Sequence, residues 1–357
     1  MHFLKIRVAF LDSDKNYLER IVTVFTNKFS DKLEIYSFSD FSLVPESLSK
    51  NRIDVLVADS SMVIDMDLIP SRCGFAYFVE SACIETFKNQ KTICKFQKIE
   101  MIYKEILGIY SEKCSNTIGL KFSGKGEGNI ISFFSPSGGS GASVTACAAA
   151  KYFVSKGSKV LYLNFETLSS TDVLLFGDGQ FDFSDVIFAL KSKKSNMALK
   201  LESYVREDNS GVNFYASPKA ALDMVELTIE DIKTLISSVK LLASYQYIVI
   251  DMDFSLSEKE LELLKLSDKI VAVSDGSEIS NKKVKDVINA FEIIEQSNDV
   301  TLLQKMFIFY NKFSNKTGKI IDDDRITMLG GTPKFEHAQS SQVMSQLCSM
   351  DVFSKLI

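Results

Sequence analysis

The residues best suited to chemistry form a stretch rich in glycine and serine, Ser135 to Val144, which follows the apolar run Ile130 to Phe134. Three glycines in four positions allow a tight backbone path, in which successive N–H groups can point at one ligand. An alanine-rich helical pattern begins near Ser143, so the positive end of a helix dipole would face the same place. A strand, a glycine loop and a helix in this order predict a phosphate-binding site, with a plain strand-to-helix turn as the alternative.

The loop lacks the lysine of the common phosphate-loop pattern G-x-x-x-x-G-K-[ST]. Gly141 fits the last glycine and Ser143 fits the hydroxyl that binds Mg²⁺, but Ala142 stands where the pattern has lysine. That lysine reaches the β- and γ-phosphates, so its loss weakens nucleotide affinity and, more severely, weakens stabilisation of the transferring phosphoryl group. The sequence therefore predicts nucleotide binding with slow or no hydrolysis.

An acid farther along the chain is a candidate for the metal. Asp251 ends the apolar run Tyr247 to Ile250, and an acid at the carboxyl end of a buried strand can hold Mg²⁺ through water. A turn-forming aspartate is the alternative, and Asp253 is a weaker candidate for the same role. Because the glycine loop lies upstream, we favour a metal role for Asp251.

The elements that must position these groups alternate between strand and helix. Strand patterns lie at 6–11, 53–58, 75–79, 91–94, 130–134, 159–163, 212–216, 247–250, 269–273 and 305–310, and helical patterns lie at 17–29, 99–110, 143–156, 228–243, 281–296 and 340–357. The stretch 115–128 is polar and has no periodicity, as a linker should. We therefore expect an α/β protein with two doubly wound parallel-sheet domains, residues 1–114 and 129–357.

Composition excludes several other classes. The chain has 357 residues and a net charge of −5, which argues against nucleic acid as the main ligand. No apolar run approaches the ~18 residues of a membrane span, and the chain enters a strand pattern at its start, which favours a cytoplasmic location. Six scattered cysteines and two histidines offer neither zinc spacing nor a disulfide framework, and they make a Ser-His-Asp or Cys-His enzyme improbable.

The glycine loop resembles that of the deviant Walker ATPases of the MinD/ParA group, K-G-G-x-G-K-[ST]-[ST]. Both lysines of that pattern are replaced here, by Ser137 and Ala142. The resemblance implies a P-loop NTPase fold for the second domain and binding of ATP with Mg²⁺, the metal lying on Ser143 and Asp251. It implies nucleotide contacts from Ser137, Gly138, Gly139, Ser140, Gly141, Ala142, Ser143 and Val144.

The same resemblance assigns roles outside the loop. Asn164-Phe165-Glu166 falls where the group carries D-x-D, so Glu166 is implied as the acid that helps to position water or metal, while Asn164 departs from the pattern. Asn311, after a strand, is implied as the residue that hydrogen-bonds adenine. A segment containing Pro333 is implied to cover the base.

The front domain resembles receiver domains of the flavodoxin-like fold, which use a carboxylate cluster for Mg²⁺, a phosphate-accepting aspartate, a hydroxyl and a lysine. The matching positions here hold Asp12, Asp14, Asp59, Ser81 and Lys95. Ser13 interrupts the usual acidic pair and Phe96 replaces the usual proline, so we favour a pseudo-receiver used for docking over a phosphorylation switch. The alternative for Asp12 and Asp59 is a helix N-cap.

A receiver-like domain in front of a MinD/ParA-like domain is similar to the TadZ/CpaE-like family of tight-adherence (type IVb, Flp) pilus assembly. That resemblance implies a homodimeric, ATP-binding factor with weak or no hydrolysis that positions pilus machinery through other Tad proteins. It implies a place at a cell pole, or at the inner face of the membrane through partners.

Two other functions stay open. One is an active ATPase in which another lysine, such as Lys151 or one from a partner chain, supplies the missing charge. The other is a two-component response regulator with a degenerate ATPase output domain. A membrane-surface helix at 340–357 is disfavoured, because the segment has one basic residue, Lys355, and core packing explains its apolar residues better.

Overall fold

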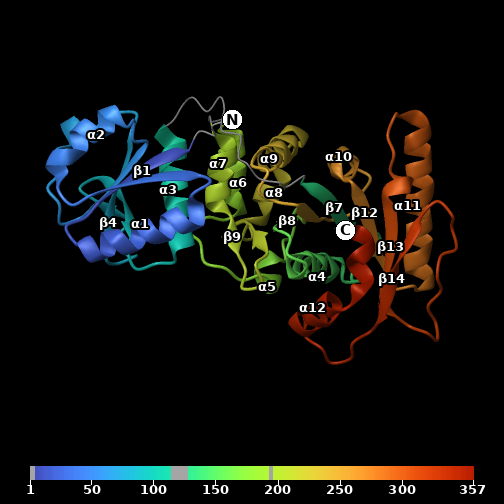
Figure 1. The fold of residues 1–357 in the computed structure, drawn as a ribbon. Helices are drawn as coiled ribbons and strands as arrows, with labels where there is room; N and C mark the ends of the chain where they lie inside the picture. The colour runs from blue at the N-terminus through green and yellow to red at the C-terminus, as the bar shows by residue number, and fades with distance from the viewer. Residues whose placement is uncertain (1–4, 114–127, 193–195) are drawn as a thin grey trace. The chain divides into compact units, whose positions relative to one another are not determined.

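The computed structural model describes residues 5–113, 128–192 and 196–357. These residues divide into two compact units, each built on its own sheet (Figure 1). The first unit takes the N-terminal part of the chain together with helix α7 (Met197–Tyr204), and the second takes the other described residues. The predicted linker at 115–128 lies outside the described residues except for Gly128.

The sheet of the first unit has the strand order β2-β1-β3-β4-β6-β5. Its strands are β1 (Ile6–Leu11), β2 (Leu33–Phe38), β3 (Val55–Asp59), β4 (Gly74–Val79), β5 (Thr86–Phe87) and β6 (Gln90–Cys94). All neighbouring strands run parallel except β5 and β6, which form an antiparallel pair. Because the chain begins in the interior of the sheet and winds both ways, the predicted doubly wound architecture is confirmed for this unit.

Helices cover both faces of this sheet. On one face α1 (Lys15–Phe29) lies beside α3 (Ile99–Lys113), with the rings of Phe29 and Tyr103 stacked 4.2 Å apart. On the other face α2 (Val44–Lys50) buries its apolar side chains against β1 and β3. The described residues of this unit also form the short helices η1 (Phe41–Leu43) and η2 (Met66–Leu68), and α7 packs on α3. The connections from β3 to β4 and from β4 to β6, all within the described residues, carry no α-helix.

The second unit has a sheet with the order β14-β13-β12-β7-β11-β8-β10-β9. Its strands are β7 (Asn129–Phe134), β8 (Val160–Asn164), β9 (Arg206–Glu207), β10 (Asn213–Phe214), β11 (Tyr247–Asp251), β12 (Lys269–Ser274), β13 (Met306–Phe313) and β14 (Thr327–Pro333). They run parallel except for the pair β9 and β10. The second doubly wound domain is therefore also confirmed, and its carboxyl strand ends share one edge, where ligands bind in such folds.

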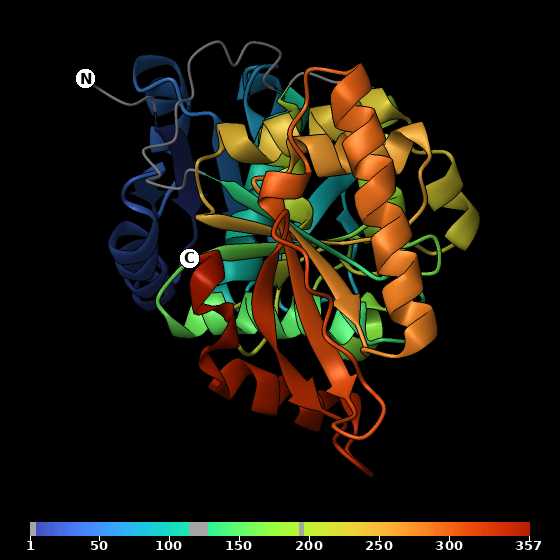
Figure 2. The same ribbon diagram turned by 90° about the vertical axis from the view of Figure 1, so that its right-hand side faces the viewer.

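Helices again lie on both faces. They are α4 (Ala142–Ser155), α5 (Thr171–Leu174), α6 (Phe183–Lys191), α8 (Ala221–Val225), α9 (Ile229–Leu241), α10 (Glu258–Leu266), α11 (Glu278–Ser297) and α12 (Ser340–Ser349), with the short helices η3 (Leu303–Lys305) and η4 (Asp351–Leu356). Helices α4 and α12 pack together on one face, and α11 lies on the opposite face (Figure 2).

The prediction of one continuous helix over 340–357 was wrong, because the segment forms two helices, α12 and η4. Met350 has extended backbone, with φ −89° and ψ 143°, and separates α12 from η4. The break lets Asp351 accept a hydrogen bond from the Tyr152 hydroxyl and lets Phe353 and Leu356 turn into the core. Core packing of this segment is thereby confirmed.

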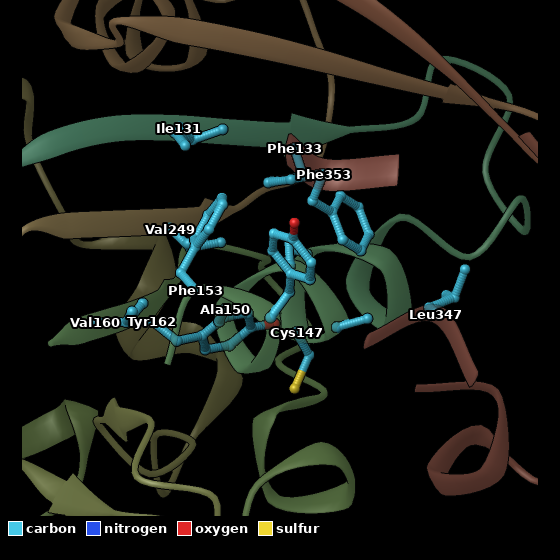
Figure 3. Packing of buried hydrophobic residues seen from close by; sticks show 14 of the residues in the cluster. Ile131, Phe133, Cys147, Ala150, Phe153, Val160, Tyr162, Val249, Leu347 and Phe353 are labelled. Carbon is cyan, nitrogen blue, oxygen red and sulfur yellow. The ribbon is translucent and has the colours of Figure 1, made fainter. Parts of the chain in front are cut away.

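The core of the second unit fixes the position of α4. Residues 146–150 of this helix are alanine or cysteine and fully buried, because small side chains let the helix approach the sheet closely. Larger side chains then fill the space around it, among them Phe153 from α4 itself and Leu347 and Phe353 from the C-terminal segment (Figure 3). Packing of this kind holds the start of α4, and with it the glycine loop, at the carboxyl ends of β7 and β11. Among the described residues, no helix is long and apolar enough to cross a membrane.

Candidate functional site

The predicted phosphate loop connects β7 to α4, as the sequence pattern requires. Gly138 and Gly139 both have φ +68°, a left-handed conformation that favours glycine, and a Cβ atom at either would meet nothing within 4 Å. The backbone therefore curls around open space at the first turn of α4. Ala142 is the first residue of this helix and Val144 packs partly buried on the core. A phosphate group fits this arrangement, because helix N–H groups without intrahelical partners face it.

Gly141 joins the loop to strand β13. It caps α4 with φ +87°, and a Cβ atom there would lie 2.6 Å from Nδ2 of Asn311. That nitrogen donates a hydrogen bond of 2.7 Å to the carbonyl of Ser140. The Oδ1 atom of Asn311 accepts one from Thr332 at 3.1 Å. Asn311 is only 2% exposed, so its amide holds the loop.

A chain of serine hydroxyls braces the other side of the loop. Ser140 Oγ lies 2.7 Å from Ser135 Oγ and donates to the carbonyl of Val273 at 3.0 Å. Ser137, which stands where the MinD/ParA pattern has its first lysine, pairs with Ser280 Oγ at 3.0 Å. The side chain at this position therefore bonds within its own unit, on the first turns of α11.

Acidic side chains meet the loop from β8 and β11. Register pairs Asp251 with Asn164 across these neighbouring strands, and Asn164 Nδ2 donates to Asp251 Oδ2 at 3.2 Å and to Glu166 Oε2 at 2.9 Å. Ser143 Oγ donates to Glu166 Oε1 at 2.9 Å, and Tyr162 donates to Asp251 at 2.7 Å. The structure thus brings together the predicted residues Ser143, Glu166 and Asp251. The weaker candidate, Asp253, instead accepts a hydrogen bond of 2.7 Å from the backbone N–H of Thr167.

Asp251 is the most perturbed acid of this cluster. It is fully buried, and burial, together with the nearby Glu166 carboxylate, raises its pKa to about 8. Its Oδ1 atom has no hydrogen-bond partner among the described residues. A buried carboxylate oxygen without a partner is costly, and a cation or a cation-bound water would satisfy it.

These residues fit a magnesium ion that shares its coordination with phosphate. No group of three or more His, Cys, Asp or Glu side chains is gathered as a metal cage in the described part of the chain. Mg²⁺ needs none here, because it retains several waters and binds one or two protein oxygens plus phosphate oxygens. Ser143 would supply the hydroxyl and Asp251 the carboxylate. The ion would neutralise charge on the terminal phosphates.

The structure locates the two predicted base-pocket residues and Lys151, the lysine considered as a substitute for the charge missing from the loop. Asn311 lies at the carboxyl end of β13, while Pro333 is exposed and ends β14, paired with Phe313. Lys151 lies 3.6 Å from Asp208 and nine residues along α4 from its start, about 13 Å at 1.5 Å per residue. The sequence reasoning missed Lys312, whose Nζ donates to the Gly139 carbonyl at 2.7 Å; its place directly after Asn311 was the available signal.

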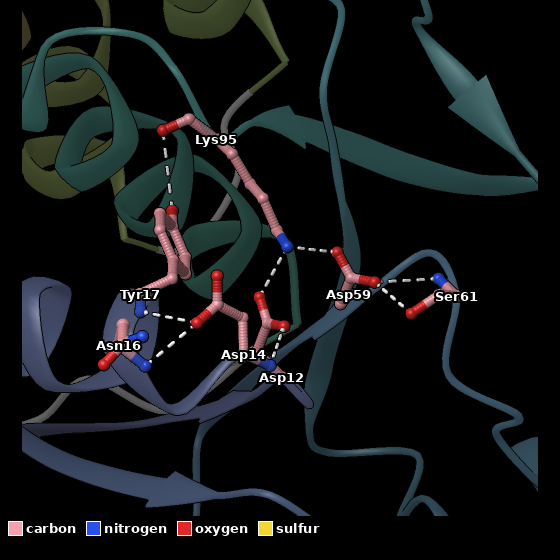
Figure 4. Close-up of polar contacts among 7 residues, drawn as sticks. All are labelled: Asp12, Asp14, Asn16, Tyr17, Asp59, Ser61 and Lys95. Carbon is pink, nitrogen blue, oxygen red and sulfur yellow. Dashed lines mark hydrogen bonds and ion pairs between the residues drawn. The ribbon is translucent and has the colours of Figure 1, made fainter.

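The first unit holds a second polar cluster at the carboxyl ends of β1, β3 and β6 (Figure 4). The Lys95 ammonium forms ion pairs with both Asp12 and Asp59, and the three side chains are 10%, 2% and 12% exposed, respectively. Ser61 donates to Asp59 from both its backbone N–H and its hydroxyl. Lys95 Nζ also lies 4.9 Å from the ring centre of Tyr17.

Charge pairing opposes desolvation in this cluster. Burial alone would raise the pKa of the Asp59 carboxyl, but hydrogen bonds from Lys95 and Ser61 hold that pKa below its ordinary value. Burial alone would lower the pKa of Lys95, yet the two carboxylates raise it above its ordinary value. Both charges are therefore kept at neutral pH.

Sequence reasoning assigned two residues of this cluster differently. Asp14 caps helix α1, accepting hydrogen bonds from Asn16 and Tyr17 backbone N–H groups, whereas Asp12 turns toward Lys95. Ser81 is exposed and accepts a bond from the Cys83 N–H at 3.3 Å. The hydroxyl on Asp59 comes instead from Ser61, two residues after it, a spacing at which serine commonly closes a turn.

Comparison with known proteins fits both units. Residues 4–111 match the family model of the TadZ-like receiver domain. No curated protein matches the chain. The crystal structure of a ParA family ATPase from Chlorobium tepidum is similar over 64% of this chain and 95% of its own, with a TM-score of 0.50 and 19% identity.

Two other solved structures are similar with lower scores. A plasmid partition protein from Borrelia burgdorferi covers 65% of this chain and 100% of its own at 21% identity and a TM-score of 0.46. The MinC:MinD cell division complex of Aquifex aeolicus covers 64% and 95% at 16% identity and 0.47. The fold of the second unit is assigned on the ParA family ATPase alone. Residues 4–111 therefore match the TadZ-like receiver domain, and the chain joins this part to a unit with the fold of a ParA family ATPase.

Proposed function

We propose that this protein is an ATP-binding positioning factor of the TadZ type, which binds Mg²⁺-ATP at loop 137–144 and hydrolyses it slowly or not at all. The observation that carries the proposal is the combination of an open glycine loop at the start of α4 with a buried, unpartnered oxygen of Asp251 beside it. The first accommodates phosphate and the second accommodates a cation, so together they favour a metal–phosphate ligand over a plain turn.

Weak turnover follows from the residues at the loop. Backbone N–H groups provide most of a phosphate cradle and are retained here, so binding survives. The lysine that would stabilise charge on the transferring phosphoryl group is replaced by Ala142, and loss of such a contact costs several kcal/mol of transition-state stabilisation. Glu166 would help to position water or metal, with its carboxylate held by Ser143 and Asn164.

The front unit serves as a docking module in this proposal. The side chain of Asp59 is 12% exposed and its two oxygens contact Ser61 and Lys95, so it is held in place with little access for a phosphoryl donor. Acetyl phosphate or beryllofluoride should therefore leave the protein unchanged, and Asp59→Asn should keep its cellular localisation. Stable modification of Asp59 with a change of oligomeric state would instead support a response regulator.

Partners and place follow from the same family. We propose a cytoplasmic homodimer that recruits other Tad proteins of the tight-adherence pilus, at a cell pole or at the inner face of the membrane through those partners. Fluorescent fusions in cells with and without the other Tad proteins would test this. A diffuse signal in both would contradict the positioning role.

Calorimetry with Mg²⁺-ATP tests the nucleotide site, and the chain offers a matched control. Gly141 and Gly157 both have φ +87°, but a Cβ atom at Gly141 would meet Asn311, whereas one at Gly157 would meet nothing within 4 Å. Gly141→Val should abolish ATP binding and Gly157→Val should retain it, although both substitutions strain the backbone equally. If Gly141→Val binds ATP as tightly as wild type, the site lies elsewhere, and a phosphate-release rate like that of an intact ParA-type enzyme would contradict slow turnover.

A further inference from the structure

Lys312 approaches the phosphate loop from another strand. Its Nζ atom donates a hydrogen bond of 2.7 Å to the carbonyl of Gly139. The neighbouring Asn311 holds the carbonyl of Ser140, so two consecutive residues of β13 bind two consecutive carbonyls of the loop. A lysine that is 173 residues away in sequence thus brings a positive charge to a loop that has none of its own.

The backbone at Lys312 is unusual for a strand. Its φ is +60°, and the pairing of β13 with β14 shifts register between Tyr310 and Phe313. A left-handed residue other than glycine is uncommon, and irregularities of this kind redirect a side chain away from the regular alternation of the strand. Such conformations are found preferentially where they serve a site.

The ammonium group of Lys312 can donate further hydrogen bonds to a ligand. Lysine has three N–H donors, and the Gly139 carbonyl takes one of them. The side chain is exposed, so a phosphate can reach it and the flexible stem can follow the phosphate. A carbonyl is a neutral acceptor, whereas a phosphate oxygen carries charge and makes a stronger hydrogen bond with an ammonium group.

We propose that Lys312 is a phosphate-contacting cation of this site, which supports nucleotide binding from β13 but does not take the catalytic position of the lysine that Ala142 replaces. The ligand class is the di- or triphosphate of a nucleoside, and the proposal rests on the ATP-binding function proposed above. Lys312 comes from the strand end that also clamps the loop, so binding of phosphate would couple to the position of β13.

Calorimetry with Mg²⁺-ATP on three variants tests this assignment. Lys312→Gln should weaken binding about tenfold, as loss of a hydrogen bond to a charged group does, and should reduce the dependence of affinity on salt. Lys312→Arg keeps the charge and should stay within about threefold of wild type. Lys316→Gln is the matched control, because Lys316 is an exposed lysine in the turn after the same strand, and it should bind as wild type.

Three outcomes would overturn one proposal or the other, and they distinguish this proposal from the one on which it rests. If wild type binds ATP and Lys312→Gln binds it equally well, with the same salt dependence, the assignment of Lys312 is overturned and the nucleotide site stands. If wild type binds no ATP, the nucleotide site is overturned and Lys312 loses its ligand with it. A loss of affinity in Lys312→Gln that is the same at low and high salt would mean that Lys312 only latches the loop, which also overturns the assignment.

Discussion

Replacing Lys95 by methionine should destabilise the first unit in a pH-dependent way. The substitution keeps most of the side-chain volume but leaves Asp12 and Asp59 near one another without their shared cation, at 2% and 12% exposure. Removing one partner of a buried ion pair costs about 3–5 kcal/mol, and the partial exposure here places the expected loss near the lower end, at about 3 kcal/mol at pH 7. Lys91→Met is the control, because Lys91 and its partner Glu112 are 55% and 43% exposed, and its loss should stay below about 0.5 kcal/mol.

The sign of the pH dependence follows from the shift at Asp59. In wild type its pKa is lowered in the folded protein, so its stabilisation is present above the unfolded value and is lost as pH falls through the folded value. Without Lys95, only the hydrogen bonds from Ser61 oppose the effect of burial on the pKa of Asp59, so its ionised form is less favourable at neutral pH and protonation relieves part of the loss. The difference between wild type and Lys95→Met should therefore be largest near pH 7 and shrink toward about pH 4.

Hydrogen exchange followed by mass spectrometry is the suitable assay, because the chain has no tryptophan and two units that need not unfold together. Opening free energies of β1 and β3 would be compared across pH after correction for intrinsic exchange. The double variant Lys95→Met/Asp59→Asn should recover a large part of the loss at pH 7. Equal losses for Lys95→Met at both pH values, or no loss beyond that of Lys91→Met, would refute this electrostatic account.

Four further outcomes concern separate parts of the molecule. Burial raises the pKa of Glu105 from 4.5 to about 7, so the folded state holds the proton more tightly, and the stability of α3 should fall by up to about 3 kcal/mol as pH rises from 4.5 to 7. Hydrogen exchange of Glu105→Gln should show a smaller loss over this pH range, and a loss equal to that of wild type would refute the assignment. Phe353→Ala should lower the free energy of unfolding by about 3–5 kcal/mol, because Phe353 is fully buried, and thermal unfolding that matches wild type would contradict the packing. Ala142→Lys should bind Mg²⁺-ATP more tightly in calorimetry, and an unchanged affinity would show that the loop does not lack this charge. Because Ser137 bonds within its own unit, a homodimer should persist at high salt and without ATP in sedimentation experiments, whereas dissociation by salt alone would show an interface held by ion pairs.

Local patterns were enough to predict the architecture and the loop. Short apolar runs predict strands such as β1 and β7, and the end of such a run followed by glycines predicts the loop, because strand, turn and helix preferences act over a few neighbouring residues. The predicted positions of Ser143 and Asp251 follow from the same logic, since parallel strands bring their carboxyl ends to one edge, whereas the role of Glu166 was implied by the resemblance to the MinD/ParA group. These inferences required only the order of residues.

Tertiary structure decided which distant side chains meet. Lys312 reaches Gly139 because β13 ends at the same edge as β7, and Met350 breaks the C-terminal helix because Phe353 packs into the core. Ser61 rather than Ser81 reaches Asp59, and α7 joins the first unit although its sequence lies far along the chain. Contacts over such separations depend on how whole elements pack, which no local spacing encodes. The positive charge that Lys312 brings to the phosphate loop could therefore be recognised only from the fold.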